Sequence, residues 1–270
     1  MSATKDTDLT TAVDTAIAAH DAWRKDRYNA LTGPTGNLSL TLTRWFPAGT
    51  TADEAAAQVA EARLSHAEGF TVTELSRRNI STGEPEYGLR VWDANSQAIQ
   101  AFDRVDTFDY NPDWVVDATF TPVSADRTVP FEHIRDAGGT RDLVVPGDIT
   151  FERDGKTFTL AAFDDDGTLL LVFGDPTNTA TDSTQTYGSG RFLFVEFTDA
   201  EPVTNSAADV TQQARSVRLD FNRAFVPPCG FSAQYNCPMP PPQNRLPWPV
   251  TAGEKLPVFT GGFDIYESLV

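Results

Sequence analysis

The spacing of hydrophobic and polar residues changes along this chain. Near the N-terminus apolar side chains recur at steps of three and four residues, whereas from Phe70 onward they alternate with polar ones. The first spacing is that of one face of an α-helix, and the second is that of a half-buried β-strand. We therefore expect an N-terminal helical layer with a first strand, residues 1–69, followed by a β-rich domain, residues 70–270.

Two helices are predicted in the N-terminal layer. The first is expected to start at Asp8, because aspartate is a favourable N-cap residue, and to run to about Leu31. The second is expected to start at Thr51, which has Glu54 three residues later in the spacing of a capping box. Gly69 stands where the C-terminal cap of this second helix belongs.

The β-rich domain consists of alternating segments joined by turns. Asp154-Gly155 and Asp166-Gly167 are dipeptides typical of tight hairpin turns. Short strands joined by frequent turns are typical of sandwiches and barrels. We predict a mainly β fold, a single β-sandwich or partly open β-barrel domain with two N-terminal helices. The predicted strands are residues 38–46, 70–75, 87–93, 98–108, 114–123, 148–154, 156–164, 168–175, 191–197, 216–221 and 256–266.

A proline-rich segment near the C-terminus interrupts the alternating pattern. Both cysteines and eight of the eighteen prolines lie between Val217 and Lys255. Proline fixes φ and lacks a backbone N–H donor, so residues 227–249 are expected to form a loop rather than a helix or a central strand. The many aromatic residues around this loop argue against disorder, and long ordered loops are often functional.

Composition and charge restrict the class of protein. A chain of 270 residues with 40% hydrophobic residues can bury a substantial core. The net charge of −17 disfavours nucleic acid and anionic membranes as partners. Because neither a secretory signal nor a long apolar run is visible, we expect an acidic cytoplasmic protein without a membrane partner. The sequence predicts no oligomeric state.

Common cofactor and metal motifs are missing from the sequence. The three histidines, His20, His66 and His133, have no metal-ligand spacing, so no metal site is expected. The acidic run from Asp164 to Gly167 lacks the spacing of a calcium loop and is better explained as a solvated turn. The cofactor, if any, is unknown at this point.

The two cysteines lie within the proline-rich loop. Cys229 and Cys237 are separated by seven residues, which is longer than the gap of a zinc knuckle. Buried thiols, a disulfide and a catalytic thiol all fit this spacing. Since cytoplasmic thiols normally stay reduced, we expect two reduced, largely buried thiols without a metal between them.

Polar residues cluster in sequence near the same loop. Asp220 and Asn222 point to one face by strand alternation, and Asp175 and Arg191 lie at the ends of other strands. Such groups can bind a polar ligand or a metal, can position a water for general-base catalysis, or can simply satisfy the irregular backbone of the loop. The candidate ligand-binding residues are Tyr187, Arg191, Asp220, Asn222, Asn244 and Glu254, and the candidate pocket walls are Phe221, Phe231, Tyr235 and Trp248.

Three functions fit these residues. The leading hypothesis is a small-molecule pocket beneath the loop, in which Arg191 favours an anionic or carbonyl-bearing ligand and lies within salt-bridge reach of Asp220. The second is a hydrolase-type enzyme with Asp220 as its general base. In the third, a structural or interaction protein, the loop only closes the end of the sandwich. The sequence leaves open whether the protein is an enzyme.

Four strings of residues resemble a known family. They are TYGSGRFL at residues 186–193, LDFNRAFVPPCGF at residues 219–231, CPMPPPQNRL at residues 237–246 and AGEK at residues 252–255. Together they resemble the signature of a large, uncharacterised bacterial family classed as a domain of unknown function. The resemblance implies a site near the loop and implies no activity.

Overall fold

The helices and strands divide between two compact units. The computed structural model describes residues 2–79, 82–124, 126–136, 138–198 and 213–267, with the side chains of the first helix described from Val13 onward. Unit 1 comprises Met1–Trp23, Val105–Pro227 and Cys237–Leu256, whereas unit 2 comprises Arg24–Arg104, Pro228–Asn236 and Pro257–Val270. Each unit therefore contains segments that lie far apart in the sequence.

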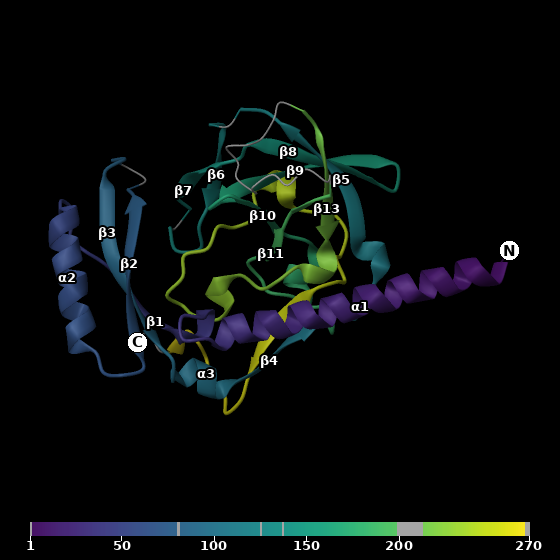
Figure 1. Cartoon of the computed structure of the whole chain (residues 1–270). Helices are drawn as coiled ribbons and strands as arrows, with labels where there is room; N and C mark the ends of the chain where they lie inside the picture. The colour runs from purple at the N-terminus through teal and green to yellow at the C-terminus, as the bar shows by residue number, and fades with distance from the viewer. Residues whose placement is uncertain (1, 80–81, 125, 137, 199–212, 268–270) are drawn as a thin grey trace. The chain divides into compact units, whose positions relative to one another are not determined.

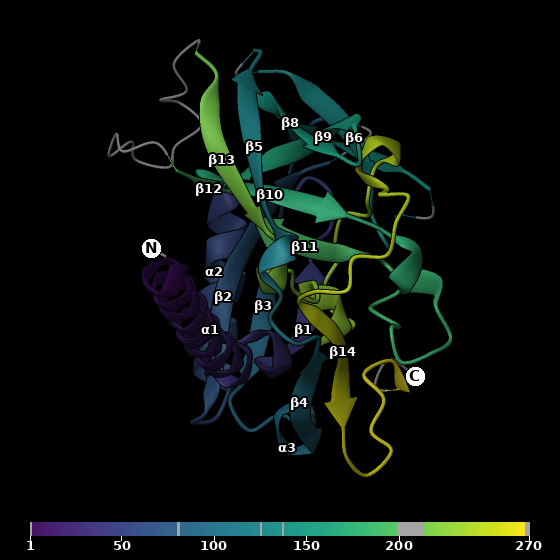
Figure 2. The same cartoon turned by 90° about the vertical axis from the view of Figure 1, so that its right-hand side faces the viewer.

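Unit 1 is built on a seven-stranded antiparallel sheet with the order β11-β10-β9-β8-β5-β13-β12 (Figure 2). Its edge strands, β11 (Arg191–Phe194) and β12 (Glu196–Phe197), are separated in the chain by Val195 alone. The sheet therefore curves until its edges nearly meet, as in a barrel, which leaves little strand edge exposed. The other strands are β5 (Val115–Pro122), β8 (Gly147–Arg153), β9 (Lys156–Asp165), β10 (Thr168–Phe173) and β13 (Arg215–Asp220).

Two tight turns fix the register of this sheet. Asp154-Gly155 connects β8 with β9, and Asp166-Gly167 connects β9 with β10. Both residues of each dipeptide have positive φ, between 49° and 89°. This is the backbone of a type I′ turn, which matches the twist of antiparallel strands. Both predicted hairpins are confirmed.

The inward-facing residues of the sheet form the core of unit 1. Along β8 and β13, buried residues alternate with more exposed ones, as expected when one face of a strand meets the core. Fully burying an aliphatic or aromatic side chain contributes about 1.5–3 kcal/mol. The core includes Phe120, Ile149, Leu160, Leu171, Phe173, Leu193, Val217, Leu219 and Phe221.

Unit 2 contains a three-stranded antiparallel sheet with the order β1-β3-β2. Helix α2 (Ala52–Ser65) packs on β2 and β3 of this sheet (Figure 1). Thr51 and Glu54 form the predicted capping box at its start. Ala55 and Val59 of α2 are buried in a cluster with residues of the sheet. The strands are β1 (Leu40–Trp45), β2 (Phe70–Arg78) and β3 (Pro85–Asp93).

Shorter elements complete the two units. Strand β4 (Phe102–Thr107) pairs with β14 (Glu254–Phe259), and β6 (Thr128–Glu132) pairs with β7 (Thr140–Val144). Among the described residues, no helix combines the length and hydropathy needed to cross a membrane. The remaining elements are α1 (Ser2–Thr32), α3 (Gln97–Ala101) and the 3₁₀ turns η1 (Asn37–Ser39), η2 (Pro112–Trp114), η3 (Pro176–Thr179), η5 (Phe221–Arg223), η6 (Pro228–Gly230) and η7 (Pro242–Asn244).

The prediction of a mainly β fold with two N-terminal helices is confirmed, but both helix boundaries need correction. Helix α1 begins at Ser2, so Asp8 lies within the helix rather than at its start. Helix α2 ends at Ser65, and Gly69, with a φ of 93°, belongs to the turn before β2. The expected division of the chain at residue 69 stays a prediction.

The predicted strands also need correction in three parts of the chain. Residues 97–101 form α3, because the Ser96 side chain caps the helix by accepting a hydrogen bond from the Ile99 N–H. The last predicted strand ends at Phe259, since paired glycines at positive φ follow it. Strands β6 and β7 lie in a segment where no strand was predicted.

Candidate functional site

Arg191 anchors the chain that follows the proline-rich loop in unit 1. Its side chain is fully buried, and its Nη2 donates to Asp175 Oδ2 and to the Val250 carbonyl, both at 2.8 Å. Its Nη1 donates to the Ala252 carbonyl at 2.5 Å and to the Glu254 carbonyl at 3.3 Å. Burial lowers the pKa of the Arg191 guanidinium, and the Asp175 and Glu254 carboxylates counteract this effect. Both terminal nitrogens of the guanidinium are thus engaged by protein groups, whereas the buried Nε has no hydrogen-bond partner among the described residues.

Asp175, rather than Asp220, is the carboxylate partner of Arg191. Its Oδ1 also accepts hydrogen bonds from the backbone N–H groups of Thr177, at 2.9 Å, and Val250, at 3.0 Å. The predicted ion pair between Arg191 and Asp220 is wrong. Arg191 starts β11 and pairs with Phe173 at the end of the neighbouring β10, so Asp175 is the carboxylate that lies nearby.

Two further candidate residues bind backbone groups of unit 1. Asn244 is fully buried, and its amide donates to the carbonyls of Ala161, at 2.8 Å, and Val172, at 2.7 Å. Its Oδ1 accepts from the Ala161 N–H at 2.9 Å. Glu254 Oε2 accepts from the Val226 N–H at 2.7 Å. In both cases the side chain satisfies backbone groups that have no ladder partner there.

The string TYGSGR brings Gly190 against the prolines of the loop. Gly190 has a φ of 92°, and a Cβ at this position would lie 2.5 Å from Pro240 Cγ and 2.6 Å from the Phe173 carbonyl oxygen. A larger residue would therefore clash as well as strain the backbone. Tyr187 is half-buried, and its carbonyl accepts hydrogen bonds from Asn178 and Gly190. The string holds one side of the loop in close contact with β10.

Asp220 and Asn222 come together through a cap rather than through strand alternation, because β13 ends at Asp220 and Phe221–Arg223 form η5. Asp220 Oδ1 accepts from the Asn222 N–H at 3.1 Å and from Asn222 Nδ2 at 2.9 Å. The Asn222 amide also exchanges two hydrogen bonds with the backbone of Asn111. Asp220 Oδ2 lies 3.5 Å from Arg223 Nε. Among the described residues, the contacts of the Asp220 carboxylate are all within three residues of it in the chain, and its role as a general base stays a prediction.

His20 and Tyr110 lie beside this pair in unit 1. The buried His20 Nε2 donates to the Asn222 carbonyl at 2.9 Å, and the centroid of its ring lies 5.5 Å from that of Tyr110. Partial burial and the Asp220 charge raise the pKa of the Tyr110 hydroxyl. Within the described part of the chain, no three His, Cys, Asp or Glu side chains form a group that could hold a metal ion.

The predicted aromatic walls divide between the two units. Phe221 belongs to the core of unit 1, and Trp248 packs edge-on against Phe158 with 4.4 Å between ring centroids. Phe231 and Tyr235 belong to unit 2.

The side chains of both cysteines are buried, with 2% of Cys229 and 6% of Cys237 exposed. Cys229 lies in unit 2 and Cys237 in unit 1. Their redox state stays a prediction.

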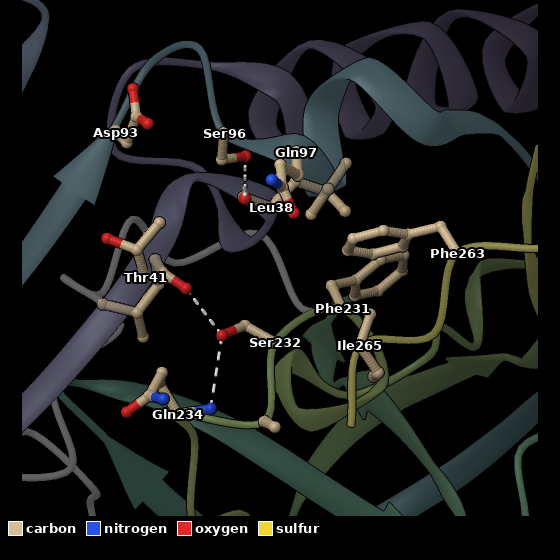
Figure 3. A pocket seen from close by; sticks show the side chains of 13 residues that line it. Leu38, Thr41, Asp93, Ser96, Gln97, Phe231, Ser232, Gln234, Phe263 and Ile265 are labelled. Atoms are coloured by element: carbon tan, nitrogen blue, oxygen red, sulfur yellow. Dashed lines mark hydrogen bonds between the residues drawn. The ribbon is translucent and has the colours of Figure 1, made fainter. Parts of the chain in front are cut away.

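Unit 2 contains a pocket of about 300 Å³ (Figure 3). One wall consists of residues 231–234 from the proline-rich loop, and three other segments, residues 38–41, 93–98 and 263–265, supply the rest. The lining residues are Leu38, Leu40, Thr41, Asp93, Ser96, Gln97, Ala98, Phe231, Ser232, Ala233, Gln234, Phe263 and Ile265. Of the residues predicted to form a site, Phe231 alone lines this pocket.

The loop forms this wall because its polar side chains bind the exposed edge of β1. Ser232 Oγ donates to the Leu40 carbonyl at 2.7 Å, and Gln234 Oε1 accepts from the Thr43 N–H at 2.9 Å. These bonds satisfy backbone groups that an edge strand would otherwise leave to water. Phe231 is fully buried, and its ring meets that of Phe102 edge-on, with centroids 6.3 Å apart.

Most lining residues were not predicted from the sequence. Ala98 and Phe263 fall in segments predicted as strands, whereas Ser96 and Gln97 lie between two predicted strands. A sequence signal for this capped helix does exist. Ser96 is a favourable N-cap residue, and the Gln-Ala-Ile-Gln run after it breaks the alternation of a strand. Thr41 and Asp93 carry no local signal that separates them from other strand residues.

Comparison with known proteins identifies the family but no activity. A family model described as "Protein of unknown function (DUF1684)" matches residues 100–255, more than half of the chain. The chain belongs to this family. None of the functionally curated proteins in the comparison matches it. Among solved structures, the chain is similar to an uncharacterized protein of Haloarcula marismortui determined by solution NMR, with 32% identity, coverage of 57% of this chain and 77% of that one, and a TM-score of 0.42.

The DUF1684 region contains the Arg191 network but only one wall of the pocket. Arg191, Asp175, Asn244 and Glu254 all fall within residues 100–255, as do loop residues 231–234. The other lining segments lie before residue 100 or after residue 255. The pocket therefore joins a segment of the family region to parts of the chain outside the match.

Proposed function

We propose that this protein binds a small molecule in the pocket of unit 2 and that the C-terminal loop forms one wall of the binding site. The observation that carries the proposal is the pocket itself, about 300 Å³, with loop residues 231–234 along one side. This volume lies at the lower limit for ligand sites, which run from about 300 to 1,000 Å³. The combination of aromatic, aliphatic and amide side chains is also typical of such sites.

The proposal places the ligand away from the polar residues that the sequence analysis named as candidate ligand-binding residues. The two Nη atoms of Arg191 donate to one carboxylate and three backbone carbonyls, so a ligand that binds these atoms would have to displace those partners. Leaving buried polar groups without partners costs about 1–3 kcal/mol for each group. The Arg191 network supports a structural role for the loop flanks, and the pocket supports a binding role for its middle.

A fragment screen by saturation-transfer NMR tests the proposal. We expect ligands that bind the native protein to lose binding in an Ala98→Phe variant, because the new ring would fill a pocket that Ala98 lines. The matched control is Ala94→Phe, which adds the same ring at a half-buried residue that does not line the pocket. Binding that survives Ala98→Phe would place the ligand elsewhere and contradict the proposal.

Other sequence predictions accompany this proposal. A cytoplasmic location, a bacterial scope of the family and the lack of a nucleic-acid partner stay predictions. The four C-terminal strings remain the proposed signature of the family, and the supporting observation is that all four lie within the matched residues 100–255.

A further inference from the structure

The pocket of unit 2 has an apolar interior and a polar rim. Leu38, Phe231 and Ile265 are 1%, 0% and 8% exposed, whereas Thr41 and Gln97 of the same lining are exposed. In Figure 3, Asp93 and Thr41 lie on the side of the pocket opposite to Phe263. A ligand with an apolar body and one polar group would match this division.

The polar groups deepest in the pocket are already engaged by the protein. Ser96 Oγ donates to the Leu38 carbonyl at 2.7 Å and accepts from the Ile99 N–H. Ser232 Oγ donates to the Leu40 carbonyl and accepts from the Gln234 N–H. The interior therefore offers few free hydrogen-bonding atoms to a ligand, and the polar group of the ligand belongs at the rim.

Asp93 is the one charged side chain among the lining residues. Its Oδ1 accepts from the Asn95 N–H at 2.8 Å, and among the described residues no donor binds its Oδ2. No arginine or lysine lines the pocket; the guanidinium of Arg27 lies 5.4 Å from the Phe231 ring centroid but is outside the lining. The net charge of −17 adds a field of the same sign as Asp93.

We infer that the pocket selects compact molecules with an apolar, preferably aromatic, body and a cationic amine, and that it discriminates against carboxylates. The carboxylate of Asp93 attracts an ammonium group and repels an anion, and the ring of Phe263 favours a ring or a cation, while Phe231 carries the Arg27 guanidinium on one face and contributes apolar surface. A cavity of about 300 Å³ corresponds to roughly ten waters of liquid volume at ~30 Å³ each, which limits the ligand to a similar number of non-hydrogen atoms. This inference rests on the proposed function.

Three probes with nearly the same body separate the effect of charge from that of shape: benzylamine, benzyl alcohol and benzoate. Affinities measured by NMR titration at low salt should fall in that order. A partly exposed ion pair is worth up to about 1 kcal/mol, so benzylamine should bind up to about fivefold tighter than the alcohol. Benzoate should bind more weakly than the alcohol by a similar factor.

Two variants test whether Asp93 is the cause. Asp93→Asn keeps an acceptor for the Asn95 N–H and removes the charge, so the three affinities should converge. The control is Asp103→Asn, which removes an exposed aspartate of unit 2 that pairs with Arg104 outside the pocket, and it should leave the order unchanged. Equal affinities in the native protein, or benzoate binding best, would overturn the inference while leaving the binding pocket in place. If none of the probes, nor any other fragment, binds, both proposals fail.

Discussion

Arg191 Nη2 donates a 2.8 Å hydrogen bond to Asp175 Oδ2, and both side chains are fully buried. Arg191 opens β11, while Asp175 follows β10 and caps the 3₁₀ turn η3. Because Asp175 Oδ1 and the Arg191 guanidinium both also bind Val250, the pair fixes the chain just after the proline-rich loop. A buried charge pair with this many partners is expected to be costly to break.

We expect Asp175→Asn to lower the free energy of unfolding by about 3–5 kcal/mol, since it leaves the buried Arg191 charge without its counterion. Urea unfolding followed by circular dichroism measures this loss. Asp117→Asn is the control, because Asp117 is 86% exposed in its pair with Arg218 and should change stability by less than about 0.5 kcal/mol. A loss below about 1 kcal/mol in Asp175→Asn would show that the pair is not the anchor described.

Asn244→Leu should also destabilise unit 1. The substitution removes the partners of one N–H and two C=O groups in β9 and β10, and each buried group left unsatisfied costs about 1–3 kcal/mol. Hydrogen exchange of the Ala161 amide should accelerate in this variant. The neighbouring Gln243 is exposed, so Gln243→Leu should leave both stability and exchange unchanged. Equal stabilities and equal exchange rates of the Ala161 amide in the two variants would contradict this account of Asn244.

Two glycines of the TYGSGR string provide a matched pair. A Cβ at Gly190 would lie 2.5 Å from Pro240 Cγ, whereas at Gly188 the nearest atom would be the Asn178 carbonyl oxygen at 3.7 Å. Gly190→Ala should therefore lower the thermal midpoint by several degrees or prevent folding, since overpacking costs about 1–3 kcal/mol before the strain of a positive φ is added. Gly188→Ala should fold with nearly native stability. Similar thermal midpoints for both variants would rule out the close approach of the loop.

The acidic hairpin turn between β9 and β10 should make the stability of the protein depend on pH. Partial burial and the neighbouring carboxylates of Asp166 and Asp164 raise the pKa of Asp165. A raised pKa in the folded state means that ionisation of Asp165 costs stability, with no cost below the unfolded pKa and the full cost above the folded one. Asp165→Asn should therefore raise the thermal midpoint near pH 7 more than near pH 4.

The control for this prediction is Asp154→Asn in the preceding hairpin, where the aspartate side chain is 91% exposed. It should leave the pH dependence of the thermal midpoint unchanged. If Asp165→Asn raised the thermal midpoint by the same amount at both pH values, the cause would be the conformation of the turn rather than the charge of Asp165.

Local signals predicted most of the fold. The hairpin dipeptides, the capping box at Thr51 and the alternating strands all act through neighbours in the sequence, and the structure contains them. Errors arose where a cap overrides the alternating pattern, as Ser96 does for α3. The sheet nearly closes because Val195 alone separates its two edge strands in the chain. The sequence does not show that these two strands lie at opposite edges, because that depends on which strands pair with which.

The site could be predicted only in part. The loop could be predicted because proline excludes regular structure, and its order could be predicted because its aromatic residues carry too much apolar surface for a disordered segment. The choice of Asp175 over Asp220 as the partner of Arg191 depends on which strands are neighbours in the sheet. The pocket combines four segments from distant parts of the chain, and no local pattern reports that proximity.

Crystallographic fragment screening tests the central claim most directly, because it shows where a small molecule binds without assuming its identity. The account predicts fragment density in the pocket of unit 2, in contact with Phe231 and Phe263 and adjacent to loop residues 232–234. Fragments with an amine should occupy it more often than fragments with a carboxylate. Density that recurs only at other sites, with this pocket empty throughout the screen, would contradict the account.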